Sequence, residues 1–276
     1  MDCWTILSNL SAVTDKIKLG PIITYLFPQY RSIALLAKQA VTLQEISNGR
    51  LEFRTGAGAT LQWSLQWWHP YGIEYPSNAE RVSMLDEGIL LLHRLWRVSG
   101  NNDNGSSIHF TGNYFKLNGA SLKRPSKTIP ITIAAKRRKT MQIAAKYADV
   151  WESSYITPEQ FASLNKKFEG IIKSQQSNNN NNSSSIDKRT IKKSIELDVI
   201  ISDTDSDLEY KKRIFAMERG PEVAYQILKH GLVGKTDKIA ERLKKYIDAG
   251  INQFFLAFQD PFDSRALESF ADVFRK

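Results

Sequence analysis

The sequence predicts an α/β fold with parallel strands, because short β-branched runs alternate with segments whose apolar residues recur at helical spacing. Such alternation implies parallel strands joined by right-handed crossovers. The run at 16–24 is apolar on both faces, as a sheet covered by helices requires. Two architectures fit, a doubly wound open sheet and a (β/α)8 barrel lacking two units. Six strands are expected, at 16–24, 51–58, 129–134, 150–153, 194–202 and 253–258.

Helix boundaries are marked by local signals. Asn48-Gly49 ends a helix at 32–47 and Gly250 ends a helix at 236–249, since glycine tolerates positive φ. Ser77 to Glu80 and Thr157 to Gln160 are capping boxes that open two further helices. We also expect a helix after the bases at 136–139 and another from about residue 264.

Two segments break the alternation within what we expect to be one domain, 1–276. Residues 101–127 carry turn signals around short alternating runs, which predicts a β-hairpin insertion. Residues 175–185 read QQSNNNNNSSS, a polar low-complexity stretch that cannot bury enough surface to order itself. We expect a mobile surface loop there.

Composition narrows the class of protein. One cysteine, Cys3, excludes an internal disulfide, and no run of ~20 apolar residues is present. We expect no signal peptide, because the first thirty residues lack a basic segment followed by an apolar one. We therefore expect a soluble cytoplasmic chain without a membrane partner. The net charge of +9 favours an acidic partner or a solvated basic surface. No nucleic-acid motif and no metal-ligand spacing among the four histidines stand out, so neither nucleic acid nor a metal is expected.

Four consecutive bases, residues 136–139, lie between a predicted strand and a predicted helix. A helix N-terminus carries partial positive charge, so cations there are unfavourable unless an anion lies among them. The carboxyl end of a barrel strand that opens onto a helix is a common anion site. The bases therefore contact a bound phosphate or other acidic group, or extend into solvent.

The order of motifs resembles the luciferase-like flavin- and deazaflavin-dependent oxidoreductases. The resemblance starts at "IKLGPIIT…ALLAKQAVTLQEISNGRLEFRTGAG" and continues through "LDEGILLLHRLW", "HFTGNYFKLNGASL", "PITIAAKRRKTMQIAAKYADVW" and "YIDAGINQFFLAF". It covers nearly the whole chain, and "YFKLNGASL" and "ITIAA" look most like the branch that uses coenzyme F-420. It implies a (β/α)8 TIM-type barrel, here without the family's first two strands, so that about six of eight strands are expected.

The resemblance implies a cofactor site at the strand ends. Lys136 and Arg137, followed by Arg138, replace two glycines at which the family holds the cofactor phosphate. The loss of these glycines leaves open a third alternative, that the bulky side chains block the site. A non-proline cis peptide is implied at Ile22–Ile23, behind the cofactor ring. Gly56, Ala57 and Gly58 would let the backbone approach that ring. In the sugar-phosphate dehydrogenases a glutamate and an asparagine follow; here these positions are Ala59 and Gln62, which argues against that activity.

Candidate substrate and catalytic residues lie on later loops. Trp63, Trp67 and Trp68 follow a predicted strand, and in this fold such loops build the active site, although packing of the loop onto the barrel is equally expected. His69 and Glu152 are weak candidates for a general acid or base. Ser154, at the end of the next strand, is assigned to the substrate pocket.

The resemblance implies an oxidoreductase that transfers a hydride between a small organic substrate and coenzyme F-420. Two alternatives stay open: a monooxygenase that uses FMN, and a non-catalytic truncated member or partner subunit. The expected partner is a small-molecule substrate, and a homodimer is the assembly to test.

Overall fold

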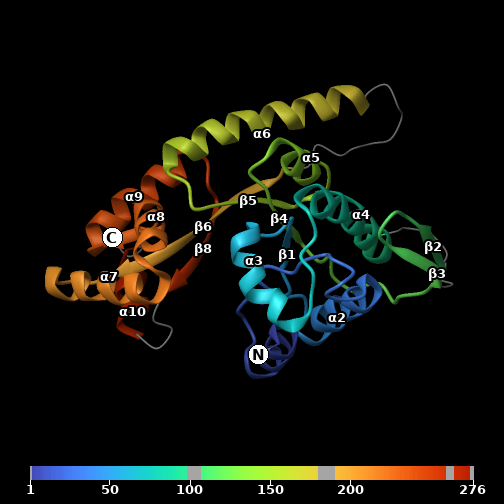
Figure 1. The fold of residues 1–276 in the computed structure, drawn as a ribbon, viewed down its shortest axis with the longest axis horizontal. Coiled ribbons are helices and arrows are strands. Elements are labelled where there is room, and N and C mark those ends of the chain that lie inside the picture. Colours follow the sequence, from blue (N-terminus) through green and yellow to red (C-terminus); the bar gives the residue numbers. More distant parts are fainter. Residues whose placement is uncertain (1, 98–106, 180–189, 259–263, 274–276) are drawn as a thin grey trace. The chain divides into compact units, whose positions relative to one another are not determined.

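A computed structural model describes residues 2–97, 107–179, 190–258 and 264–273 (Figure 1). The chain divides into two compact units, Met1–Trp151 and Glu152–Lys276. Each is described by itself. Both contain parallel strands that alternate with helices, which confirms the predicted α/β class.

In the first unit, β1 (Phe53–Gly56) pairs in parallel with β4 (Ile131–Ala134), and β5 (Val150–Ser154) follows β4 in the strand order. Gly56 lies opposite Ala134 at the carboxyl ends of the first pair. The helices of this unit are α1 (Cys3–Val13), α2 (Ile33–Ile46), α3 (Leu61–Trp68), η1 (His69–Tyr71), α4 (Asn78–Arg97) and α5 (Arg138–Tyr147).

The core of the first unit forms around β1. The fully buried ring of Phe53 contacts Trp4 of α1 and Trp96 of α4, with centroid separations of 6.3 and 5.1 Å. The indole N–H of Trp96 donates to the carbonyl of Ala37, at 3.3 Å, and so joins α4 to α2. Aromatic burial of this kind contributes much of a core's stability.

Both predicted capping boxes are present. At the start of α4 the amide of Ser77 donates to Glu80 at 2.9 Å, and the amide of Glu80 donates to the Ser77 hydroxyl at 3.4 Å. Thr157 and Gln160 repeat the arrangement in the second unit, at 2.9 and 3.3 Å. These bonds satisfy amides that the first turn of a helix leaves without a partner.

The prediction of a regular strand at 16–24 was wrong. The segment makes only two isolated parallel bridges, Leu19 with Leu51 and Thr24 with Thr55. Between them, Pro21 has no amide hydrogen to donate to a ladder. A side chain at Gly20 would collide with the carbonyl of Glu52, at 2.4 Å, so this part of the backbone packs directly on the residue that precedes β1.

A β-hairpin lies within the predicted insertion. There β2 (Ile108–Thr111) pairs antiparallel with β3 (Lys116–Ala120), and residues 121–127 form no strand. The Glu87 carboxylate of α4 accepts hydrogen bonds from three consecutive turn amides, those of Asn113, Tyr114 and Phe115, at 2.8 to 3.0 Å. The first part of the predicted insertion, 101–106, lies outside the described residues.

In the second unit, β6 (Lys192–Ile201) is the long strand. Its first part pairs in parallel with β8 (Gln253–Phe258), and its end pairs with β7 (Leu232–Gly234). The helices are α6 (Pro158–Asn179), α7 (Asp205–Arg219), α8 (Pro221–His230), α9 (Thr236–Asp248) and α10 (Ser264–Asp272).

Three features of the second unit differ from expectation. Residues 175–179 of the predicted loop continue α6 as helix, while 180–185 lie outside the described residues. Neither the α7–α8 pair nor β7 was anticipated. Leu208 and Phe215 bury one face of α7 against Ile200 and Ala224, which explains why this polar-looking helix is held in place.

Candidate functional site

Three chain segments meet at the carboxyl ends of β1 and β4. A β-carbon added to Gly56 would lie 3.2 Å from that of Ala134 and 3.3 Å from Cδ1 of Ile23. In folds with parallel strands, ligand sites form at this end of the sheet. Of the predicted residues, Ile23 and Gly56 are thus brought together within the first unit, and the basic run begins two residues after Ala134.

The peptide bond between Ile22 and Ile23 is cis, at the position that the family resemblance implied. The side chain of Ile22 is 60% exposed, and Ile23 is half-buried. The amide of Thr24, one residue on, donates to the carbonyl of Arg54 at 2.9 Å and so joins this bend to β1.

The basic run follows β4, and all four side chains, Lys136 to Lys139, are exposed. Arg137 occupies the N-cap position of α5 and gives the helix no side-chain cap. Instead, the Thr140 hydroxyl accepts from the Arg137 amide at 3.3 Å and donates to its carbonyl at 2.9 Å. An arginine has no acceptor for first-turn amides, so this N-terminus combines open amides with four cations.

Packing inside the chain explains Gly58. Its φ is 86°, and an added β-carbon would lie 2.2 Å from the hydroxyl oxygen of Tyr75. The hydroxyl of Tyr75 and a guanidinium nitrogen of Arg81 both donate to the carbonyl of Ala59, at 3.0 and 2.6 Å. Contact of this turn with a flat ring stays a prediction.

The aromatic loop after β1 is partly helical. In α3, Trp68 stacks on Tyr30, with ring centroids 3.9 Å apart, and meets the ring of Tyr25 at 6.0 Å. Trp67 is 48% exposed, and His69 is exposed at the start of η1. Trp68 therefore packs the loop onto the first unit, which is the structural alternative given for this residue in the sequence analysis. The side chains of Gln62 and Trp63 lie outside those described.

The other two predicted residues lie on the end of β5, in the part of the strand that belongs to the second unit. Glu152 is fully buried. The hydroxyls of Ser154 and Tyr155 donate to the two carboxylate oxygens of Glu196, at 3.3 and 3.4 Å. Burial, and then the nearby Glu196, raise the pKa of Tyr155 well above its usual range. Tyr155 also has a positive φ of 51°.

Several polar residues near these positions were not predicted from the sequence. Glu196 could have been found from β6, where Ser194, Glu196 and Asp198 alternate with apolar residues along the strand. Arg81 is 6% exposed, although the sequence pattern places it only in the first turn of a helix. The signal for its surroundings was the aromatic stretch "TYLFPQY" at 24–30.

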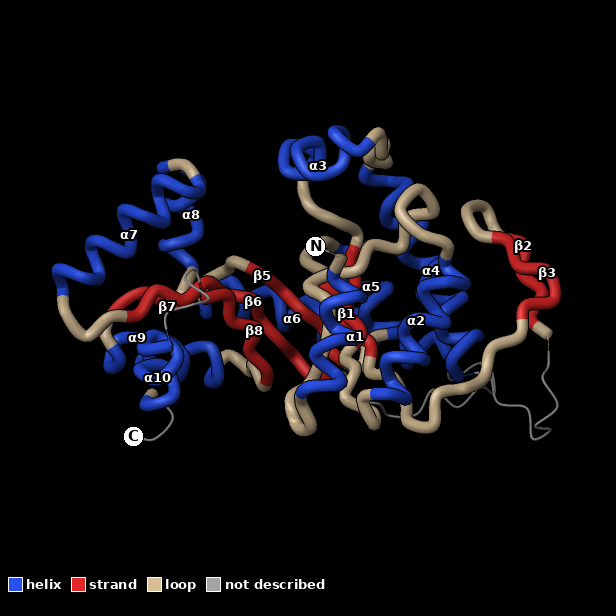
Figure 2. Tube along the Cα trace, turned by 90° about the horizontal axis from the view of Figure 1, so that it is seen from below, coloured by secondary structure: helices blue, strands red, loops and turns tan. Residues whose placement is uncertain are grey.

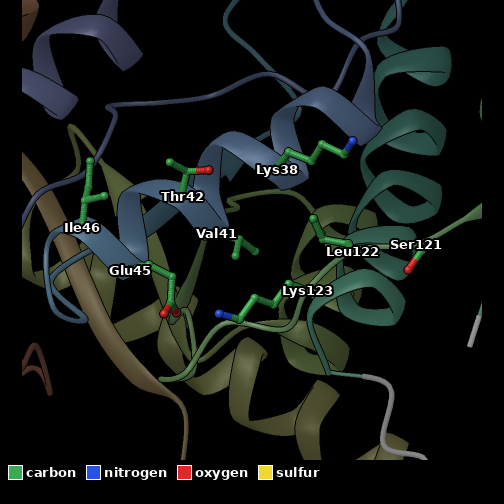
Figure 3. Close-up of a pocket in the computed structure, with 8 residues that line it drawn as sticks. All are labelled: Lys38, Val41, Thr42, Glu45, Ile46, Ser121, Leu122 and Lys123. Carbon is green, nitrogen blue, oxygen red and sulfur yellow. The ribbon is translucent and has the colours of Figure 1, made fainter. Parts of the chain in front are cut away.

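A groove with a cavity volume of about 410 Å³ lies between α2 and the segment after β3 (Figure 3). None of the predicted site residues lines it. Its walls carry Lys38 and Glu45 from α2 and Lys123 from the opposite segment, over Val41 and Leu122. Across the described ranges, no helix is both long and apolar enough to span a bilayer, and no three acidic, histidine or cysteine side chains are grouped to hold a metal.

These features define an α/β protein with a candidate ligand site at the carboxyl ends of its strands. The chain belongs to the luciferase-like monooxygenase family, whose family model matches residues 1–216. It is similar to the 5,10-methylenetetrahydromethanopterin reductase of Archaeoglobus fulgidus, with 32% identity over 146 residues. That match covers 53% of this chain and 39% of the reductase, so the chain spans about two-fifths of this relative's length.

Two further comparisons cover more of the chain. A coenzyme F-420-dependent glucose-6-phosphate dehydrogenase of Amycolatopsis mediterranei is 25% identical over 267 residues, which are 90% of this chain and 74% of that enzyme. A solved coenzyme F-420-dependent secondary alcohol dehydrogenase, holding an adduct of the coenzyme with acetone, matches with a TM-score of 0.78 at 19% identity. The match covers 99% of this chain and 83% of that one. The predicted barrel-type fold is thereby confirmed.

Proposed function

We propose that the protein is an oxidoreductase that transfers a hydride between a small organic substrate and coenzyme F-420. Support comes from the family and from relatives that carry this coenzyme in their names. The observation that carries the proposal is the exposed basic run at the open N-terminus of α5, immediately after β4.

The residues present fit an anionic cofactor. The open amides of the first turn and the side chains of Lys136, Arg137 and Arg138 would hold its acidic group, which would offset the repulsion between the cations and the helix dipole. Ile22 and Ile23 would support one side of the ring beside Gly56. When bound, the coenzyme supplies the two-electron hydride chemistry, and the chain orients it and excludes competing reactions.

The substrate is expected to differ from a sugar phosphate. The family resemblance gives the sugar-phosphate dehydrogenases a glutamate where this chain has Ala59. The methyl side chain of Ala59 cannot accept or donate a proton as a carboxylate would. The main-chain carbonyl of Ala59 accepts hydrogen bonds from Tyr75 and Arg81.

The alternative is a monooxygenase that uses FMN, which the description of the family model favours. The same open N-terminus would then hold the FMN phosphate. A cofactor panel separates the two: preferential binding of FMN with oxygen-dependent product formation would select the alternative. Binding of neither cofactor would favour the other alternative, a non-catalytic truncated family member or partner subunit.

The basic run is tested by removing two of its charges. Replacing Arg137 and Arg138 together by Ala should weaken coenzyme F-420 binding by tenfold or more, because each charge-assisted contact contributes about 1.5–3 kcal/mol. Fluorescence titration of the coenzyme measures this. Lys244→Ala, an exposed cation on α9, is the matched control and should bind like the unmodified protein. Equal affinity in the double variant would refute this placement of the acidic group.

A further inference from the structure

Arg81 is a buried cation without a carboxylate partner among the residues that the structure describes. It is 6% exposed. Its terminal nitrogens donate to the Ala59 carbonyl at 2.6 Å and to the side chain of Asn78 at 3.2 Å, and its guanidinium carbon lies 4.3 Å from the ring centroid of Tyr75. The third nitrogen, Nε, is buried and has no hydrogen-bond partner within the described ranges. A buried charge of this kind is costly unless a counter-charge reaches it.

Two more buried donors belong to the same cluster of rings. The hydroxyl of Tyr30 and the indole N–H of Trp68 have no hydrogen-bond partner in the described part of the chain. Their rings are in stacked contact, at 3.9 Å. Leaving a buried donor unsatisfied costs about 1–3 kcal/mol, so native proteins rarely keep several together without a reason.

The ring contacts connect these donors to Arg81. Phe27 meets the ring of Tyr30 at 5.2 Å and that of Tyr75 at 5.9 Å, and Tyr75 lies under the Arg81 guanidinium. Burial raises the pKa of Tyr30, whereas the positive charge of Arg81 acts in the opposite direction. The three groups thus present donors and one positive charge, with no acidic side chain in the set.

We propose that Arg81, Tyr30 and Trp68 form an anion subsite that binds the carboxylate or phosphate of a small substrate. Guanidinium forks and neutral N–H and O–H donors suit the planar or tetrahedral oxygens of such groups. That the bound anion is part of a substrate rests on the oxidoreductase function proposed above. Anion binding at these residues does not depend on that function. The substrate class is a small organic acid, or a phosphate ester other than a sugar phosphate, whose reacting carbon lies beyond its anionic group.

The anion reaches these donors by displacing part of α3. All three donor atoms are sealed from solvent, and Trp68 covers Tyr30. In Figure 2, α3 stands beyond the carboxyl end of β1 and is joined to it by a loop. Its outward residues Leu61 and Leu65 are about half exposed, at 56% and 45%, so few buried contacts oppose such a movement.

The test follows the Trp68 indole N–H in the coenzyme-free protein. The chain has six tryptophans, so the indole region of a ¹H–¹⁵N NMR spectrum holds six signals, and the Trp68→Phe variant assigns the relevant one. Sodium benzoate and inorganic phosphate are added as separate probes, with benzyl alcohol as the neutral counterpart of benzoate. We expect at least one of the two anions to shift the Trp68 signal saturably and benzyl alcohol to leave it unchanged. The probe that shifts it identifies the source as a carboxylate or a phosphate.

Tyr30→Phe supplies the decisive variant, because it removes a hydroxyl that has no partner to lose among the described residues and should fold normally. It should weaken anion binding by about tenfold, the effect of one hydrogen bond to a charged group. Tyr71→Phe, at a 79% exposed ring of the same loop, should bind like the unmodified protein. A Trp68 signal insensitive to both anions, or unchanged affinity in Tyr30→Phe, would overturn the proposal. Since no coenzyme is present, these results are independent of those for Arg137 and Arg138.

Discussion

The indole N–H of Trp151 donates a hydrogen bond to the main-chain carbonyl of Ala135, with the nitrogen and oxygen 2.7 Å apart. Trp151 is fully buried on β5, and Ala135 is the last residue before the basic run. A rigid interior side chain therefore sets where the exposed cations begin, which couples the core of the first unit to the candidate anion site.

Trp151→Phe should destabilise the protein by about 2–4 kcal/mol, because it leaves a buried carbonyl without its donor and removes packed volume. It should also weaken coenzyme F-420 binding, since the start of the basic run loses its anchor. Urea unfolding and fluorescence titration measure the two effects. Trp67→Phe, on the exposed side of α3, should change stability by no more than about 0.5 kcal/mol. Equal effects of the two substitutions would contradict this role for Trp151.

Alanine substitutions at Gly58 and Gly72 distinguish the stability cost of backbone strain from that of steric overlap. Both have positive φ, 86° and 68°, but only Gly58 has a neighbour in the way, the Tyr75 hydroxyl at 2.2 Å from an added β-carbon. Gly72→Ala should cost about 1–2 kcal/mol through backbone strain alone. Gly58→Ala should cost about 3 kcal/mol or more, because steric overlap is added.

Tyr75→Phe tests the steric overlap at Gly58 directly, because it removes the colliding oxygen. The double variant Gly58→Ala, Tyr75→Phe should therefore lose less stability than the sum of the losses in the two single variants. Thermal unfolding of the four proteins completes the double-mutant cycle. Strict additivity would mean that the overlap is relieved by other movements.

Much of the fold was readable from the sequence because its signals are local. The two capping boxes and the strand at 253–258 depend on a few neighbouring residues, and the structure has them where predicted. The prediction of a strand at 16–24 was wrong because it rested on the apolar pattern alone. That pattern takes no account of the missing amide hydrogen at Pro21 or of the close backbone approach at Gly20. Helix α7 was missed because its buried face contains little more than Leu208 and Phe215, seven residues apart.

The Glu87 carboxylate should hold the β2–β3 hairpin against α4. Glu87→Ala removes the acceptor of three turn amides, at 2.8 to 3.0 Å, so the amides of 113–115 should exchange with solvent at least tenfold faster. Hydrogen exchange read by mass spectrometry measures this. Glu80→Ala, at the capping box of the same helix, should leave hairpin exchange unchanged, and protection that survives in Glu87→Ala would contradict the anchor.

Stability should fall at alkaline pH through the buried tyrosines. Burial raises the pKa of both Tyr155 and Tyr246. The native state therefore holds their phenolic protons more tightly than the unfolded state, in which tyrosine titrates near its ordinary value of about 10. The free energy of unfolding should be steady with respect to these groups below about pH 10 and fall above it.

Tyr155→Phe tests whether the raised pKa of Tyr155 contributes to this loss of stability at alkaline pH. The variant should lose stability less steeply above about pH 10 than the unmodified protein, whereas Tyr210→Phe, at a 55% exposed ring, should not change the slope. Urea unfolding between about pH 8 and 11 measures both. An unchanged slope in Tyr155→Phe would contradict the assigned shift.

The candidate site was only partly readable, for a physical reason. A run of four cations and a family-like order of motifs are visible along the chain. The cluster of Arg81, Tyr30 and Trp68 is not, because its members lie far apart in sequence and their unsatisfied donors exist only once the rings have packed. Glu196 likewise becomes notable only when Ser154 and Tyr155 are placed beside it.

As a member of the luciferase-like family, this chain is proposed to bind a deazaflavin coenzyme. Equilibrium dialysis of the full chain against coenzyme F-420, with FMN in a parallel cell, measures this binding. We predict saturable binding of one F-420 per chain with micromolar or tighter affinity, and weaker binding of FMN. A folded chain that does not bind F-420 would overturn the proposed function.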